Sequence, residues 1–143
     1  MPDQTLILIG GGGHAIVVAE AALLLGIQPI GFIDDDANAP LAKGSPAAAW
    51  MGRLSDGSAL TDALAAHPGA RWILALGHLG VRRAVIVRLA GLRERTVSII
   101  HPTALISPSA TVGAGVFVGP RAIVNTRAGV QDFAIINTGA IVE

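Results

Sequence analysis

The chain has 143 residues, of which 52% are hydrophobic and only 14% charged, and ten basic side chains balance ten acidic ones. This composition predicts a well-filled core and excludes a disordered chain. A net charge of zero with 3% aromatic residues excludes a basic stripe or stacking platform for nucleic acid.

Other chemistries are also excluded by what the chain lacks. With no cysteine there is no disulfide, no thiolate nucleophile and no zinc ribbon, and we expect no metal site. The opening residues MPDQ lack the basic region of a signal peptide, and no apolar run is long enough for a membrane span. We therefore expect a cytoplasmic protein that binds neither membrane nor nucleic acid.

A glycine-rich turn separates the first predicted strand from the first predicted helix. Thr5–Ile9 is a short apolar run that favours a strand, and residues 15–26 read as an apolar helix. The turn between them consists of Gly10, Gly11, Gly12, Gly13 and His14. Glycines let backbone N–H groups approach a phosphate, and a helix N-terminus favours negative charge. A plain tight turn is the alternative interpretation.

Acidic residues follow the second predicted strand. The segment PIGFIDDD begins at Pro29 and ends in Asp34, Asp35 and Asp36. Strand, glycine turn, helix, strand and acid is the order of a dinucleotide-type βαβ unit, with the acid about 20 residues after the glycines. A solvated acidic loop is the alternative, and we expect Asp36 to lie in one.

The middle of the chain predicts a helix between two loops. Residues 38–49 are rich in Pro, Gly and Ala and predict a surface loop. Ser55 and Asp56 are candidate caps for a helix through ALTDALAAH, which Pro68 stops.

Two further strands and a helix complete the predicted first domain, residues 1–101. Arg71–Leu76 predicts a third strand, followed by Gly77 and His78. Residues 81–92 have apolar side chains at helical spacing, and three arginines are expected to face solvent: Arg82, Arg83 and Arg88. Thr96–Ile100 predicts a fourth strand. The expected architecture is a Rossmann-like α/β domain with a small parallel sheet.

A six-residue repeat fills the second predicted domain, residues 102–143. Its inward aliphatic positions are Ile106, Val112, Val118, Val124, Val130, Ile136 and Val142. Small residues follow four positions later at Ala110, Val116, Ala122, Ala128, Ala134 and Ala140. Fixed-period repetition marks a solenoid, and three hexapeptides per turn predict the first two coils of a left-handed parallel β-helix. Asn125 and Asn137 are expected at corners, where Asn tolerates left-handed backbone.

These segments together resemble the NeuD/PglD group of sugar O- and N-acyltransferases. The resemblance rests on GGGGHA, GFIDD, ALGHLGVRR, HPTALISPSA and NTGAIVE, which occur in this order. It implies acetyl transfer from acetyl-CoA to a nucleotide-linked amino sugar or a sialic acid, in bacterial surface glycan biosynthesis. It also implies that the first domain holds the nucleotide sugar, and that the β-helix forms a homotrimer with acetyl-CoA between subunits.

The resemblance implies roles for single residues as well. Gly10 to Gly13 and His14 would face the phosphates or the sugar, and Asp34 and Asp35 would contact the base or ribose. Gly77 and His78 would line the same cleft. Asn137 is the substrate-binding candidate in the coils.

Catalysis in the resembled group depends on a histidine that follows the segment INTGAIVE and acts as general base. This chain ends at Glu143, one residue before that position, so we expect it to be a truncated and inactive acyltransferase. Glu143 would orient the base, or is a plain surface carboxylate. A catalytically silent nucleotide-sugar-binding module is the alternative function. A nicotinamide-dependent oxidoreductase is disfavoured, because the chain has no tyrosine and its single lysine, Lys43, lies in a predicted loop.

Overall fold

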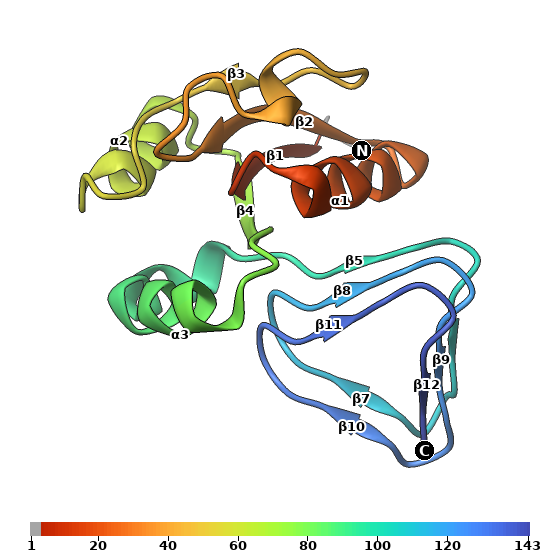
Figure 1. Cartoon of the computed structure of the whole chain (residues 1–143). Coiled ribbons are helices and arrows are strands. Elements are labelled where there is room, and N and C mark those ends of the chain that lie inside the picture. The colour runs from red at the N-terminus through yellow and green to blue at the C-terminus, as the bar shows by residue number, and fades with distance from the viewer. Residues whose placement is uncertain (1–3) are drawn as a thin grey trace.

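The computed structural model describes residues 4–143, and it places a helix-covered parallel sheet on a three-sided coil (Figure 1). The sheet has four strands in the order β3-β2-β1-β4, all parallel. Their bounds are β1 Gln4–Ile9, β2 Ile27–Ile33, β3 Ala49–Trp50 and β4 Arg71–Leu74. This order, with the glycine turn after the central β1, is Rossmann-like, as predicted.

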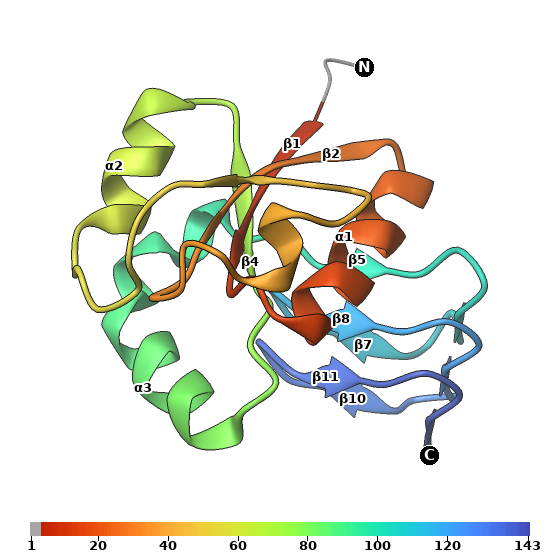
Figure 2. The same cartoon turned by 45° about the horizontal axis from the view of Figure 1, so that its top comes forward.

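Helices cover both faces of the sheet because β1 is apolar on both sides. Leu6 and Leu8 belong to a core shared with α1 (Gly13–Leu24), whereas Ile7 and Ile9 belong to a core shared with α2 (Ala59–Ala66) and α3 (Leu79–Arg88). Figure 2 shows α1 on one side of the sheet and the other two helices on the opposite side. A strand buried on both faces reads as a continuous apolar run, which explains TLILI.

Helix boundaries differ from those predicted by a few residues. The N-cap of α2 is Ser58, so neither Ser55 nor Asp56 caps it. The helix predicted over 81–92 begins earlier, at Leu79, and gives way to a 3-10 segment, η2, at Ala90–Arg95. A second 3-10 segment, η1, covers Pro40–Ala42 inside the predicted loop.

The prediction that Thr96–Ile100 forms the fourth strand of the sheet is wrong. Thr96 makes a single bridge with Trp72, and β5 (Ile99–Ile100) pairs with a strand of the coils instead. The fourth strand of the sheet is β3, at the end of the segment predicted as a loop. The reason is that Ile100 lies six residues before Ile106 and already belongs to the repeat.

Three short parallel sheets form the sides of the coil: β5-β8-β11, β6-β9-β12 and β7-β10. The strands are β6 Leu105–Ile106, β7 Thr111–Val112, β8 Phe117–Val118, β9 Ile123–Val124, β10 Gly129–Val130, β11 Ile135–Ile136 and β12 Ile141–Val142. Contacts between successive turns join residues 18 apart, such as Arg127 N–H and Ser109 Oγ. Each turn therefore takes three hexapeptides, as predicted.

Aliphatic and small residues of the repeat both fill the interior of the coil. The buried members of this core are Val116, Val118, Ala122, Val124, Ala128 and Val130. Left-handed backbone also recurs every six residues, at Gly115, Arg121, Arg127, Phe133 and Gly139. The prediction of left-handed corners at Asn125 and Asn137 is wrong, because the turn reaches positive φ two residues later. Asn125 Oδ1 instead accepts a hydrogen bond from Thr126 N–H at 2.8 Å.

Candidate functional site

The glycine turn joins the central strand β1 to the N-terminus of α1. Gly10 has φ +111°, and a Cβ there would lie 2.8 Å from the carbonyl oxygen of Ala75. A Cβ on Gly11 would lie 2.6 Å from the ring of Phe32. These two glycines are therefore required by the local packing of the turn itself.

The next two glycines have no such structural requirement. Gly12 is the N-cap of α1 and Gly13 its first residue, and a Cβ on either would have no atom within 4 Å. Within the described chain, no side chain caps this helix, and its first turn contains no acid. The turn thus leaves an uncovered helix N-terminus where a negatively charged group would be stabilised.

Asp34 holds the glycine turn in place. Its Oδ2 accepts a hydrogen bond from Gly11 N–H at 2.8 Å, and its Oδ1 accepts one from Asp36 N–H at 2.9 Å. Its backbone carbonyl accepts from Trp50 Nε1–H at 2.8 Å. Much of the acceptor capacity of this carboxylate is already used within the protein, so Asp34 positions the turn.

Asp35 faces a different space, a pocket of about 460 Å³ between α3 and the turn at Leu54 and Ser55. Its Oδ1 accepts a hydrogen bond from Ser55 N–H at 2.7 Å, and this bonding lowers the pKa of the carboxyl group. The other lining residues are His78, Gly80, Val81, Ala84, Val85 and Arg88. The pocket lies at the carboxyl ends of β2 and β4, the edge where ligands bind in open α/β sheets.

Gly77 and His78 follow β4 and connect the two parts of the site. A Cβ on Gly77 would lie 3.9 Å from the Cβ of His14, so Gly77 adjoins the glycine turn. His78 lines the pocket and caps α3, with its Nδ1 accepting from Val81 N–H at 3.4 Å. The structure thus brings together Gly10 to His14, Asp34 and Gly77 in one cluster, and Asp35 and His78 in the neighbouring pocket.

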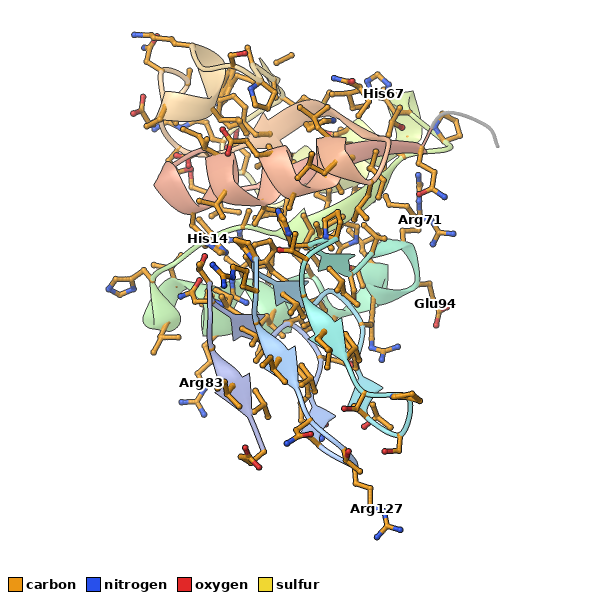
Figure 3. All side chains as sticks on the ribbon, turned by 90° about the vertical axis from the view of Figure 1, so that its right-hand side faces the viewer. His14, His67, Arg71, Arg83, Glu94 and Arg127 are labelled. Atoms are coloured by element: carbon orange, nitrogen blue, oxygen red, sulfur yellow. The ribbon has the colours of Figure 1, made fainter. Side chains whose placement is uncertain are left out.

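His14 lies at the junction between α1 and the coils (Figure 3). Its ring meets the ring of Phe117 edge-on, with 5.4 Å between centroids. Burial, and secondarily the charge of Arg82, lower the pKa of His14. Its Nε2 is buried and has no hydrogen-bond partner among the described residues. These surroundings favour the neutral imidazole.

Arg82 is the residue of the site region that sequence reasoning placed wrongly. It was expected to face solvent but is 5% exposed, whereas Arg83 and Arg88 are exposed. Its guanidinium donates to the carbonyl oxygen of Leu76 at 2.7 Å and to that of Phe133 in the coils. The spacing of residues within α3 could not predict the burial of Arg82, because its partner Phe133 lies 51 residues further along the chain.

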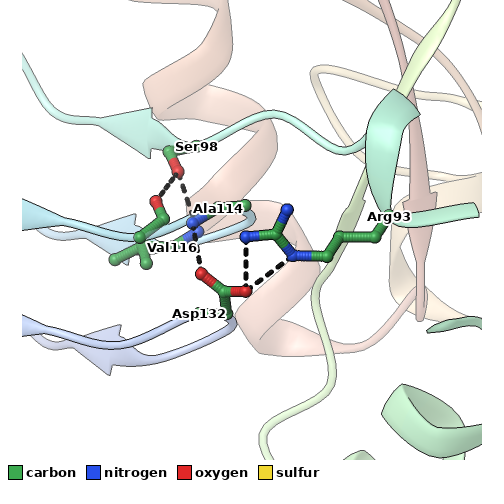
Figure 4. Close-up of polar contacts among 6 residues, drawn as sticks. Arg93, Ser98, Ala114, Val116 and Asp132 are labelled. Carbon is green, nitrogen blue, oxygen red and sulfur yellow. Dashed lines mark hydrogen bonds and ion pairs between the residues drawn. The ribbon is translucent and has the colours of Figure 1, made fainter.

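Polar contacts also join the sheet domain to the coils (Figure 4). Arg93 forms an ion pair with Asp132 at 2.7 Å, and Asp132 Oδ1 accepts from Ala114 N–H at 2.8 Å. Ser98 Oγ donates to the carbonyl oxygen of Gly113 and accepts from Val116 N–H. The ion pair links η2 to the coils, whereas the Ser98 bonds join residues 15 and 18 apart in successive turns of the coil itself.

Two candidate residues lie in the coils, apart from the glycine turn. Glu143 ends the chain at the part of the coil farthest from the sheet (Figures 1 and 2), and its Oε2 lies 3.4 Å from Asn125 Nδ2. Asn137 is exposed, and its carbonyl oxygen accepts from Ala140 N–H at 3.0 Å. A single chain therefore does not bring Glu143 to the glycine turn.

The fold and the turn agree with a known family. The PglD N-terminal domain family matches residues 5–89, which is more than half of the chain. The chain belongs to this family. The resemblance predicted from the glycine turn and the hexapeptides is therefore confirmed.

Solved structures match the PglD-like chain over 96% of its length at 31% identity. One is PerB from Caulobacter crescentus in complex with CoA and GDP-perosamine, with a TM-score of 0.78 and 62% of that chain covered. Another is a mutant of perosamine N-acetyltransferase from the same bacterium in complex with the same molecules, with a TM-score of 0.80 and 62% covered. A third is the acetyltransferase domain of PglB from Neisseria gonorrhoeae in complex with acetyl coenzyme A, with a TM-score of 0.79 and 63% covered.

The chain thus spans about three fifths of the length of these proteins. None of the curated proteins compared with the chain matches it. In the part that the structure describes, no helix has the length and apolar character needed to cross a membrane.

Proposed function

We propose that the complete protein is an acetyltransferase that moves the acetyl group of acetyl-CoA to an amino group of a nucleotide-linked sugar. The observation that carries this is the match to acetyltransferases bound to CoA, acetyl-CoA or GDP-perosamine, over 96% of the chain and across both of its parts. In the reaction the amine nitrogen attacks the thioester carbonyl, the C–S bond breaks and CoA leaves as the thiol. We place this reaction in the biosynthesis of bacterial surface glycans.

The phosphates of the nucleotide sugar are proposed to bind over Gly12 and Gly13. The open space beside both glycines and the uncapped N-terminus of α1 support this position. The adjoining pocket, which Asp35 and His78 line, then takes the nucleoside. His14 and Gly77 face the side of the turn next to the coils, where the sugar is proposed to lie.

Proton removal from the amine requires a general base. Glu143 Oε2 accepts a hydrogen bond from Asn125 Nδ2 at 3.4 Å, and the role proposed for Glu143, that of orienting the base, rests on the resemblance alone. The ring of His14 packs against Phe117 with its Nε2 buried, which makes it a poor candidate for the base. We therefore propose that residues 1–143 alone bind the nucleotide sugar without transferring acetyl, and that Asn137 contacts substrate only in the assembled enzyme.

A homotrimer is proposed from the outward residues of the coil. On the side facing the sheet, Ile99 and Phe117 point outward and are covered by the sheet domain, with 0% and 1% exposed. On the next side, Leu105 and Ile141 flank Ile123 in register and are 57% and 61% exposed. An apolar column of this kind favours burial against another copy of the chain, with acetyl-CoA proposed to bind between copies.

Thiol release from acetyl-CoA tests the proposal when the complete protein is offered GDP- and UDP-linked amino sugars. GDP-mannose, which has no amine, is the matched control acceptor. Thiol release with an amino sugar but not with GDP-mannose, together with the acetylated sugar nucleotide by mass spectrometry, supports the transferase. Binding without thiol release would indicate a silent binding module, and calorimetric binding of NADH but of no sugar nucleotide would overturn the proposal.

A further inference from the structure

Arg82 is the one charged side chain that is buried in the part of the chain that the structure describes, with 5% of its surface exposed. Its guanidinium donates to the carbonyl oxygen of Leu76 at 2.7 Å and to that of Phe133. Leu76 follows β4 in the sheet domain, whereas Phe133 lies in the corner of the coil between β10 and β11. A single planar group therefore joins the two domains.

The first of these carbonyl groups belongs to the segment that borders the glycine turn. A Cβ on Gly10 would lie 2.8 Å from Cδ2 of Leu76. A Cβ on Gly77, the next residue after Leu76, would lie 3.9 Å from the Cβ of His14. Arg82 thus holds the segment that adjoins the turn on the side next to the coils, where the sugar is proposed to lie.

Other contacts also join the two domains, but none of these involves a residue of the turn or of the segment beside it. Phe133 stacks on Trp72 with 5.9 Å between ring centroids, and the exposed side chains of Arg93 and Asp132 form an ion pair. An exposed ion pair is screened by solvent and contributes little. A guanidinium fork, by contrast, fixes the direction of both groups that accept from it. Arg82 therefore adds a defined orientation of the turn relative to the coils.

We propose that Arg82 is a positioning residue for acetyl transfer, which holds the sugar-binding side of the glycine turn in register with the coils. The inference rests on the proposed function and adds a residue outside the site that sets the geometry of the reaction. The amine must come within about 3–3.5 Å of the thioester carbonyl, and a displacement of about 1 Å can lower a rate about 100-fold. In this role Arg82 touches neither substrate, so its loss slows transfer and spares nucleotide binding.

Steady-state thiol release by the complete protein tests this role. GDP-perosamine and a UDP-linked 4-amino sugar are each offered with saturating acetyl-CoA, and kcat and KM are measured with the faster of the two. The variants are Arg82→Met, which removes both hydrogen bonds, and Arg82→Lys, which keeps the charge but lacks the planar fork. Arg93→Met is the matched control, because it breaks the exposed link between the same domains. Thermal unfolding identifies a temperature at which each variant is folded, and calorimetry gives the Kd of the same sugar nucleotide.

We expect Arg82→Met to lower kcat by about 10- to 100-fold and to leave the Kd of the sugar nucleotide within about 3-fold. Arg82→Lys should lie between Arg82→Met and the unaltered protein, and it decides the same question if Arg82→Met does not fold. Arg93→Met should keep kcat within about 3-fold. An unchanged kcat in every folded Arg82 variant, or a loss of nucleotide affinity as large as the loss of kcat, would overturn the positioning role and leave the transferase proposal standing. Absence of thiol release by the unaltered protein would overturn both.

Discussion

Arg82 of α3 donates a hydrogen bond to the carbonyl oxygen of Phe133, a residue of the coils that lies 51 positions further along the chain. The same guanidinium donates to Leu76 at the end of β4. Phe133 itself has φ +60° and stacks on Trp72 of the sheet domain at 5.9 Å. This corner of the coil is therefore built into the core that contains α3, and the two parts of the chain are held as one packed unit.

Replacing Arg82 by Met should destabilise the protein by about 2–4 kcal/mol, because two buried carbonyl groups lose their donor. The matched control is Arg83→Met on the exposed face of the same helix, which should stay within about 0.5 kcal/mol. Urea unfolding of both variants measures the difference. Equal stability of the two variants would mean that the buried guanidinium contributes nothing net to the junction.

Replacing Gly12 by Ala should leave folding unchanged and weaken binding of the sugar nucleotide. The methyl group meets no protein atom within 4 Å but occupies the space proposed for the phosphates. We expect a thermal midpoint close to that of the unaltered protein and an affinity lower by about 10-fold or more, the loss of one charge-assisted hydrogen bond. An unchanged affinity for the sugar nucleotide in calorimetry would show that its phosphates do not bind at this turn.

Gly10→Ala is the contrasting variant and should behave in the opposite way. Its methyl group would approach the carbonyl oxygen of Ala75 to 2.8 Å at a φ of +111°. The cost in unfolding free energy should be about 1–3 kcal/mol.

Replacing Val118 by Asp should unfold the coils. Val118 is 0% exposed in a core of aliphatic side chains, and an unpaired carboxylate there should cost more than about 4 kcal/mol. Thr111→Asp, an exposed position of the same coils, is the control. Circular dichroism and limited proteolysis detect the loss, and a stable Val118→Asp protein would contradict the inward register.

The inward register could be predicted because each coil needs an aliphatic side chain at a fixed place, and a single sequence shows that period. The left-handed corners could not be predicted from residue preference. Arg121, Arg127 and Phe133 adopt φ near +60° because of their place in the turn, although none of these residue types favours it. The geometry of the coil therefore decides where φ is positive, and the tolerance of asparagine for left-handed backbone led to the wrong prediction at Asn137.

The candidate site likewise has a part that could be predicted from the sequence and a part that could not. Glycines after a strand and acids after the next one could be placed at one sheet edge from the sequence, because parallel strands end together. The acceptors that Asp34 has already used on Gly11 and Asp36 depend on tertiary contacts. So does the burial of Arg82, which follows from a coil that packs on α3 and not from the spacing within that helix.

Replacing Ile141 by Lys should dissociate the proposed homotrimer without unfolding its subunits. Ile141 is 61% exposed beside Ile123 on the outside of the coil, so a lysine there can extend into solvent without entering the core of the coil. Sedimentation of the complete protein should change from trimer to monomer. Thr111→Lys, on another side of the coil, should remain trimeric. A trimer that survives Ile141→Lys would place the contact on a different side.

The stability of the protein should fall as the pH is lowered through the range where histidine titrates, and His14 should account for part of this fall. Burial, followed by the charge of Arg82, lowers the pKa of His14 in the folded state relative to the unfolded state. At neutral pH the imidazole is neutral in both states. As the pH falls through about 6.5, the ordinary pKa of histidine, the unfolded chain takes up a proton that the folded chain does not. Unfolding is then favoured, and the loss of stability levels off once the pH is below the pKa that His14 has in the folded protein.

Urea unfolding at pH 7.5, 6.5 and 5.5 measures this pH dependence of stability, which should be shallower in His14→Gln than in the unaltered protein. An unchanged slope in His14→Gln would show that His14 titrates alike in the folded and unfolded chains.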